Sequence, residues 1–322
     1  MNVLLVRADG IGDALCCVPL LAALHDAGHA VGVVLGTANS SIFARRAVRA
    51  VHVLERIPWP RHGSTAGSRN VALAQVRAAR YDVALVASEE MDAYAFAHDA
   101  GIARRVGYAN GWEKPFKTLR VSRLLTKMML RPASAARACE HEVETIFRLG
   151  AGLCDGSVPS RDALRLGALV LDVPARAHGR VVLQVSRKLD REGLDLPAYV
   201  ALARDLIANG ARVLAIGDDP EWLVEIARES GAGLRANLSL KAWKACIAGA
   251  RALVTPDSGA AHIAGMLGVP CVDCFPMRTT TVRDIARWHP WAARYRAHVL
   301  DPAHDRAETG GALAQAALEL LA

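Results

Sequence analysis

Long apolar runs are absent from this sequence, since none approaches the roughly 18 residues that a transmembrane helix needs. The chain opens on a strand-like pattern and not on a positively charged leader. The seven cysteines are scattered and odd in number, which argues against a secreted disulfide framework. We therefore expect a cytoplasmic protein.

Several binding motifs are also missing. Gly10 and Gly12 suggest a dinucleotide fingerprint, but Leu15 stands where that pattern needs a third glycine, so a nicotinamide or flavin site is disfavoured. Cys271 and Cys274 form a CxxC without a second pair to complete a zinc site, and their surroundings predict a buried strand. The chain has no DxD triplet to hold a divalent ion against a sugar nucleotide. We expect neither a metal nor a cofactor.

What the sequence does contain is alternation of strand and helix patterns. The 322 residues, 52% of them hydrophobic, exceed the size at which one core keeps growing, so two domains are expected. The alternation is typical of parallel βαβ units, and it lapses into Gly, Ser, Pro and charge between 150 and 179. We predict domains over 1–172 and 173–300 and a closing segment over 301–322. The predicted strands cover 3–6, 31–35, 51–54, 82–87, 181–185, 212–216, 252–255 and 269–275, and the predicted helices cover 14–25, 71–80, 140–149, 197–209, 221–229 and 240–249.

A strand, an acidic turn and a helix start follow one another late in the chain. Apolar residues 252–254 predict the end of a strand, and Asp257 or Ser258 can cap the helix that follows. Gly259 lets backbone approach a ligand, and the free amides of a helix start attract phosphate. The alternative is an ordinary capped helix with His262 facing the core.

A second turn of related design lies near residue 10. The apolar strand Val3 to Val6 leads into the turn Arg7 to Asp13, and an apolar helix follows. Asp13 would stand on the first helical turn at the carboxyl end of the strand, where open parallel sheets bind ligands. Its alternative role is a helix cap.

Basic residues are concentrated between Gly101 and Arg131. This segment holds eight basic residues, one acid (Glu113), and interleaved apolar residues such as Trp112 and Phe116. Such a surface suits an anionic, partly apolar partner, for example phosphorylated lipid at a membrane face. Nucleic acid is disfavoured because no recognition motif accompanies the charge, and a solvated basic face is the remaining alternative.

The two turns together resemble a known family. LLVRADGIGDALCCVPLLAAL near the start and VTPDSGAAHIAGMLGVPCVDCF near the end are similar to the signatures of glycosyltransferase family 9, the ADP-heptose:lipopolysaccharide heptosyltransferases. The resemblance implies an α/β protein of GT-B fold, in which two Rossmann-like domains with parallel sheets face a cleft. It further implies that the first domain binds the acceptor and the second binds the nucleotide-sugar donor.

The resemblance also implies roles for individual residues. Asp13 falls on the catalytic base, and Asp257, Ser258, Gly259 and His262 fall on the donor signature. Glu221 matches an acidic residue that binds ribose, although a first-turn Glu is equally ordinary on a helix. From their position directly after a strand, we add Ser186, Arg187 and Lys188 to the predicted donor site. Gly12, Arg120 and Arg123 are the predicted acceptor-binding residues.

Two departures from the family pattern are present, of which the first leaves the donor open and the second concerns the loop leading to Arg278. Glu192-Gly193-Leu194 stands where many relatives carry a Lys before a Trp-Pro pair, and Phe275-Pro276 lacks an intervening glycine. The segment 277–298 is either a donor-side lid or a basic helix, and by analogy with GT-B enzymes the segment 301–322 packs on the first domain.

The function implied is that of an inverting, metal-independent transferase. It would move a heptose or related sugar from a nucleotide-diphosphate donor to a hydroxyl of an anionic glycan or glycolipid, at or near the inner face of the cytoplasmic membrane. The alternatives are another GT-B sugar-nucleotide enzyme, such as an epimerase, and a catalytically silent binding partner.

Overall fold

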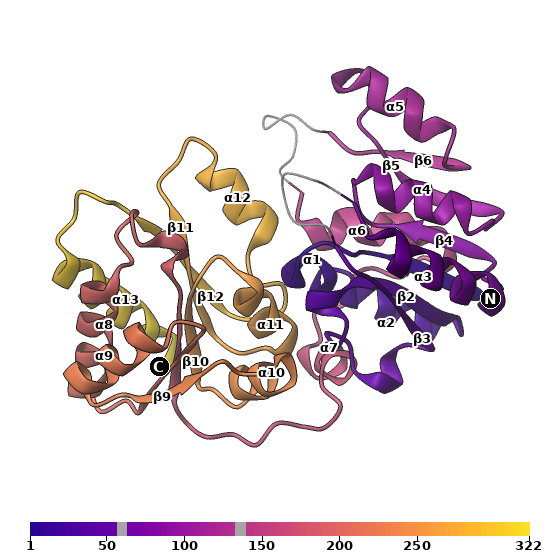
Figure 1. The fold of residues 1–322 in the computed structure, drawn as a ribbon. Coiled ribbons are helices and arrows are strands. Elements are labelled where there is room, and N and C mark those ends of the chain that lie inside the picture. The colour runs from indigo at the N-terminus through magenta and orange to yellow at the C-terminus, as the bar shows by residue number, and fades with distance from the viewer. Residues whose placement is uncertain (57–62, 133–139) are drawn as a thin grey trace. The chain divides into compact units, whose positions relative to one another are not determined.

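The structure is a computed structural model that describes residues 1–56, 63–132 and 140–322. Contacts divide the chain into two compact units (Figure 1). The first holds Met1–Arg161 and Ala168–Asp172, and the second holds Asp162–Gly167 and Val173–Ala322. Each unit contains a six-stranded parallel sheet with helices packed on it. The α/β fold class expected from the sequence is confirmed.

The first sheet has the strand order β3-β2-β1-β4-β5-β6. The order reverses between β1 and β4, so the carboxyl end of β1 lies at the switch point where open parallel sheets form a crevice. The residues that follow β1 are those of the predicted catalytic turn. The strands are β1 (Asn2–Val6), β2 (Ala30–Gly36), β3 (Ala50–Leu54), β4 (Val83–Val86), β5 (Arg104–Ala109) and β6 (Lys127–Leu130).

The helix expected over 14–25 is two helices. Pro19 lacks an N–H and cannot bond the carbonyl of Leu15, so the first helix ends and a second begins, with Pro19 in its opening turn. The break leaves the Asp13 turn on a short helix of its own. The helices of this unit are α1 (Ile11–Leu15), α2 (Val18–Asp26), α3 (Ala66–Ala79), α4 (Met91–Asp99), α5 (Pro115–Ser122) and α6 (Glu142–Gly150), with short 3₁₀ turns η1 (Thr37–Asn39), η2 (Arg45–Ala47), η3 (Gly111–Glu113) and η4 (Ala151–Leu153). Helix α7 (Ala163–Val170) has residues in both units.

The second sheet has the order β12-β11-β10-β7-β8-β9. Its reversal falls between β7 and β10, whose carboxyl ends carry Ser186 and Asp257. The predicted donor residues therefore occupy the switch point of this sheet. The strands are β7 (Val181–Val185), β8 (Val213–Gly217), β9 (Gly233–Ala236), β10 (Ala252–Pro256), β11 (Cys271–Pro276) and β12 (Tyr295–Leu300).

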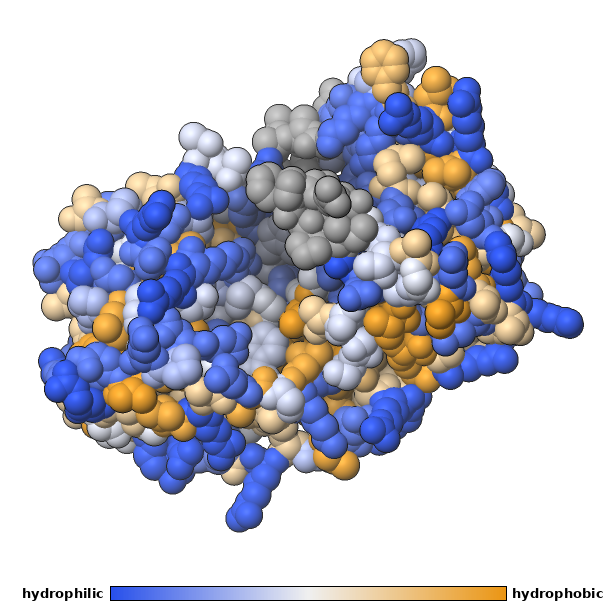
Figure 2. Space-filling view, viewed as in Figure 1, coloured by the Kyte–Doolittle hydropathy of each residue, from blue (hydrophilic) through white to orange (hydrophobic). Residues whose placement is uncertain are grey.

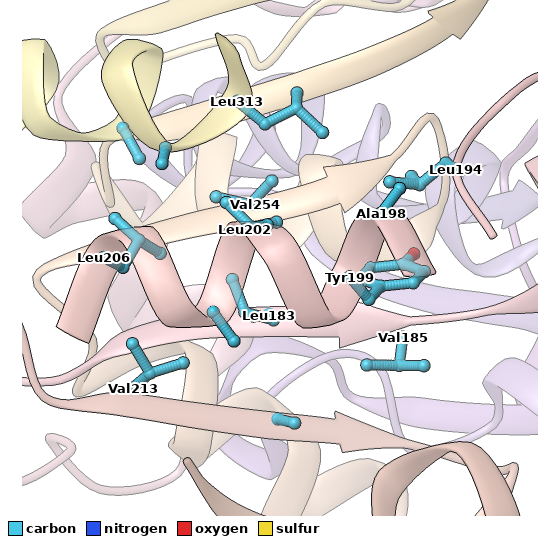
Figure 3. Packing of buried hydrophobic residues seen from close by; sticks show 14 of the residues in the cluster. Leu183, Val185, Leu194, Ala198, Tyr199, Leu202, Leu206, Val213, Val254 and Leu313 are labelled. Carbon is cyan, nitrogen blue, oxygen red and sulfur yellow. The ribbon is translucent and has the colours of Figure 1, made fainter. Parts of the chain in front are cut away.

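The terminal helix packs within the second unit, against α8, and its packing on the first domain stays a prediction. Leu313 shares a core with Leu202 and Val254, where α13 packs against α8 (Figure 3). The two helices approach closely because Gly310 has no side chain: a Cβ there would stand 2.7 Å from the backbone nitrogen of Leu202. The helical elements are η5 (Arg187–Leu189), α8 (Leu196–Ala208), α9 (Pro220–Ser230), α10 (Leu240–Ala248), α11 (Gly259–Leu267), α12 (Thr281–Trp288) and α13 (Arg306–Leu321).

Four strands were not predicted: β5, β6, β9 and β12. Three of them, β6, β9 and β12, stand at sheet edges, where few side chains are buried. The segment 277–298 contains helix α12 and the first residues of β12, so its helical interpretation is correct in part. None of the helices in the described ranges has the length and apolar character that a membrane span requires.

Candidate active site

Asp13 is held by two donors at the end of β1. The buried side chain of Arg7 bonds one carboxylate oxygen at 2.5 Å, and the backbone N–H of Gly10 donates to the other at 3.1 Å. A Cβ at residue 10 would stand 2.9 Å from that second oxygen, so glycine permits the approach. The carboxylate is thus fixed in orientation, while 30% of the Asp13 side chain remains exposed.

Behind Asp13 lies a buried network of charges that sequence reasoning missed. Glu142, at the start of α6, is fully buried and pairs with Arg7 at 3.3 Å. Both of its oxygens also accept from Arg131, at 3.1 and 2.8 Å, and Arg131 continues to Glu89 at 3.1 Å. Burial raises the pKa of Glu142, while Arg7 and Arg131 act in the opposite direction. The position of Arg7, and through it of Asp13, therefore depends on a residue 135 positions away.

A second carboxylate, Asp9, stands in the same turn. It pairs with Arg7 at 3.2 Å and accepts from the Ser88 hydroxyl at 2.9 Å. Burial raises the pKa of Asp9, and 19% of its side chain is exposed against 30% for Asp13. Of the two carboxylates, Asp13 is the more accessible to a substrate.

The predicted acceptor residues are spread over the first unit. Gly12 lies in α1 next to Asp13, whereas Arg120 and Arg123 are exposed at the end of α5. Within the described residues, neither arginine side chain bonds the Asp13 turn. Their role in acceptor binding stays a prediction.

The donor turn forms as the sequence predicts. Strand β10 ends at Pro256, and α11 starts at Gly259. The hydroxyl of Ser258 caps the helix by accepting from the Ala260 N–H at 3.3 Å. The Asp257 N–H donates to the carbonyl of Cys274 at 2.9 Å, which fixes the turn to β11. The result is a helix N-terminus at a switch point, the geometry that favours phosphate.

Two cations of η5, the turn that follows β7, lie at this edge of the second sheet. The Lys188 ammonium donates to the Asp257 carbonyl and lies 3.6 Å from that residue's carboxylate. Arg187 pairs with Asp219, lies 3.8 Å from the exposed Glu221, and stacks over Trp222 at 4.9 Å. Ser186 caps η5 by accepting from the Lys188 N–H at 3.2 Å. These predicted donor residues therefore form one connected group.

His262 stands in the first turn of α11. Its ring is buried and lies edge-on to Trp288 of α12, with centroids 5.9 Å apart. The core-facing alternative describes this placement better than a ring open to solvent. Contact of His262 with the donor stays a prediction.

Asp273 is a further residue that the sequence analysis passed over. It is fully buried in β11, in register with Thr255 beside the donor turn, and neither carboxylate oxygen has a hydrogen-bond partner within the described residues. Burial, together with the Asp257 charge, raises the pKa of Asp273 well above its usual range. The sequence feature that could have identified Asp273 is the presence of an acid within the otherwise apolar run 269–275.

The CxxC pair lies on opposite faces of the same strand. Cys271 and Cys274 are three residues apart, an odd spacing in a strand, and both are buried thiols. They cannot converge on one metal ion without distorting β11. Across the described ranges, no group of three or more His, Cys, Asp or Glu residues could hold a metal ion. Cys139 lies outside those ranges.

The two six-stranded parallel sheets give the chain an α/β architecture of the GT-B type. Residues 193–309 match the family model of glycosyltransferase family 9 (heptosyltransferase). The resemblance to this family is thereby confirmed over these residues, which include 257–262, and with it the expectation of a glycosyltransferase. A comparison with curated proteins gives no match.

Solved structures share the fold along the whole chain. E. coli heptosyltransferase WaaC with ADP is 18% identical with a TM-score of 0.75, covering 99% of this chain and 100% of that one. A glycosyl transferase family 9 protein from Veillonella parvula is 12% identical, with a TM-score of 0.73 and coverages of 99% and 97%. E. coli ADP-heptose lps heptosyltransferase II is 18% identical, with a TM-score of 0.71 and coverages of 100% and 98%.

Proposed function

We propose that this protein is an inverting heptosyltransferase. It transfers a heptose or related sugar from a nucleotide-diphosphate donor, ADP-heptose before others, to a hydroxyl of an anionic glycan or glycolipid of the lipopolysaccharide-core type. The family 9 match over 193–309 carries the proposal, because that segment contains the donor turn. The likeness to a structure described as a heptosyltransferase with ADP supports adenine as the nucleobase of the donor.

In this proposal the second unit binds the donor. The N-terminus of α11, formed by Ser258 and Gly259, meets the diphosphate, and Lys188 and Arg187 supply positive charge as the leaving group develops. Glu221 is exposed and available to the ribose hydroxyls. In the proposed step, the helix terminus and these cations stabilise the negative charge of the leaving group, and no metal ion is used.

The first unit supplies the base. The Asp13 carboxylate takes the proton of the acceptor hydroxyl as its oxygen attacks the anomeric carbon. The bond from that carbon to the diphosphate oxygen breaks, and its electron pair leaves with the nucleoside diphosphate. Attack from the face opposite the leaving group inverts the anomeric centre. Arg7 and Gly10 hold the two carboxylate oxygens, so the base enters the reaction already oriented.

In the same proposal, an anionic acceptor binds to exposed cations of the first unit. Arg120 and Arg123 are exposed cations suited to phosphate or carboxylate groups of a core glycan, and Gly12 leaves room beside the base. A glycolipid acceptor is presented by a membrane, so the proposed enzyme works at the cytoplasmic face of one.

A donor screen followed by a turnover assay tests this function. ADP-, GDP- and UDP-sugars are compared by thermal shift, because a ligand at a hundred times its Kd stabilises the folded state by about 2.7 kcal/mol. We expect ADP-heptose to give the largest shift, and nucleoside-diphosphate release to require a glycan acceptor. Conversion of the sugar nucleotide without acceptor would indicate an epimerase. Binding without release under any acceptor would indicate a silent relative.

A further inference from the structure

The corner formed by η3, α5 and β6 exposes large apolar side chains that the fold does not use. Trp112 is 95% exposed and Phe116 is 83% exposed. The inner face of α5 is already occupied, since Val121 is fully buried in the core of the first unit. The apolar corner residues are Trp112, Phe116, Leu119, Met128 and Leu130, all of them exposed.

These side chains belong to one surface, because η3 is tied to both neighbouring elements. The Thr118 hydroxyl on α5 donates to the Gly111 carbonyl at 3.0 Å. On the other side, a Cβ added at Gly111 would stand 3.0 Å from the Leu130 side chain of β6. Phe116 and Leu119 are three apart on a helix, and Met128 and Leu130 are two apart on an edge strand. Each pair therefore shares a face.

The same corner is cationic. Two of the eight basic residues between 101 and 131 bond other groups of the first unit. Arg131 pairs with Glu142, and Arg105 donates to the Leu124 carbonyl at 2.6 Å. A third, Lys117, lies 3.6 Å from Glu89. The other five are exposed and make no side-chain ion pair with any described residue: Arg104, Lys114, Arg120, Arg123 and Lys127. Figure 2 shows hydrophobic and hydrophilic side chains standing together over α5, at the top of the view.

We infer that this corner, Trp112 to Leu130 of the first unit, docks the protein on the surface of an anionic lipid bilayer. Exposed aromatic residues enter the headgroup region, and the unpaired cations meet acidic headgroups. A mixed surface of this kind suits a bilayer, which offers negative charge directly above an apolar layer. A nucleic acid would offer the charge without the apolar layer.

Two double variants separate the contributions. Trp112→Ser with Phe116→Ser removes the apolar contact, and each loss weakens vesicle binding about tenfold. Lys114→Glu with Lys127→Glu reverses the charge at both positions, which should weaken vesicle binding by at least about fivefold for each residue. Leu164→Ser with Val282→Ser is the apolar control, since these residues are 88% and 84% exposed elsewhere. Lys241→Glu with Arg251→Glu is the charge control, again at exposed positions.

The assay is co-sedimentation of the full chain with phosphatidylcholine vesicles, with and without phosphatidylglycerol, in the absence of nucleotide and glycan. The result is therefore independent of the transferase reaction. We expect binding to the anionic vesicles alone, weakening as salt rises. Both corner variants should lose binding by the factors given, and both controls should stay within twofold of wild type. Thermal unfolding verifies that all four variants are folded.

Three outcomes would overturn the inference. Wild type could fail to sediment with anionic vesicles, or both corner variants could bind as wild type does. A third outcome is that charge reversal abolishes binding while Trp112→Ser with Phe116→Ser has no effect, and a DNA duplex binds more tightly than vesicles do. That pattern would assign the corner to nucleic acid.

Discussion

Replacing Glu142 by Gln should destabilise the first unit more than any surface change of the same chemistry. Glu142 is fully buried, and it bonds Arg7 and Arg131, which are themselves buried. Removing one partner from a buried ion pair costs about 3–5 kcal/mol, because the remaining charge is left without compensation. Arg7 retains Asp13 and Asp9, and Arg131 retains Glu89. We therefore expect the lower end of that range, a loss of about 3 kcal/mol.

Urea unfolding followed by far-UV circular dichroism measures this loss. With a slope of about 2 kcal/mol per molar, the midpoint of the first unit's transition should fall by about 1.5 M. Glu140→Gln is the matched control: Glu140 lies two residues away and pairs with Arg148 at 2.6 Å, but both side chains are partly exposed. Its effect should stay within about 1 kcal/mol. Equal midpoints for the two variants would refute the argument that the buried network holds Arg7 in place.

Three further changes test other parts of the structure. Leu313→Ala removes a fully buried side chain between α13 and α8 and should cost about 2–5 kcal/mol in the second unit by urea unfolding, whereas a loss under about 1 kcal/mol would place α13 outside the core. Asp273→Asn should become more stabilising as pH rises. Burial raises the pKa of Asp273 in the folded state, so the wild type takes up a proton on folding. The wild type therefore loses stability as pH rises above the unfolded pKa of about 4, by at most about 1.4 kcal/mol per pH unit. A pH-independent difference in free energy of unfolding between pH 5 and 8 would contradict this. Lys188→Ala should weaken nucleoside-diphosphate binding at least tenfold in titration calorimetry, as expected for a lost charged hydrogen bond of about 1.5–3 kcal/mol, while Lys241→Ala leaves it unchanged.

The two turns could be predicted because local chemistry specifies them. Each follows an apolar strand and carries a small or capping residue, Gly10 in one case and Ser258 in the other, and the structure forms both turns. The break at Pro19 was also available from the sequence, since proline cannot continue a helix from residues before it. The sequence predicts one helix over 14–25 because its apolar residues continue on both sides of Pro19.

Other features depend on long-range pairing that no local pattern encodes. Glu142 and Arg7 are 135 residues apart in sequence, and nothing near either residue identifies its partner. The edge strands β6 and β9 are four residues long and none of their side chains is buried, so neither shows the pattern of a buried strand. The basic segment was predicted as one surface, but strand formation draws Arg131 inward, into the network with Glu142.

The measurement that bears most directly on the proposed function compares Asp13→Asn with wild type in two assays. The amide keeps the shape of the side chain and removes its ability to accept the acceptor's proton. Nucleoside-diphosphate release in the presence of acceptor should fall by about 10²–10⁴-fold. Donor affinity by titration calorimetry should stay within about twofold of wild type, because the proposed donor residues lie in the second unit. Turnover at the wild-type rate in Asp13→Asn would contradict the assignment of Asp13 as the base.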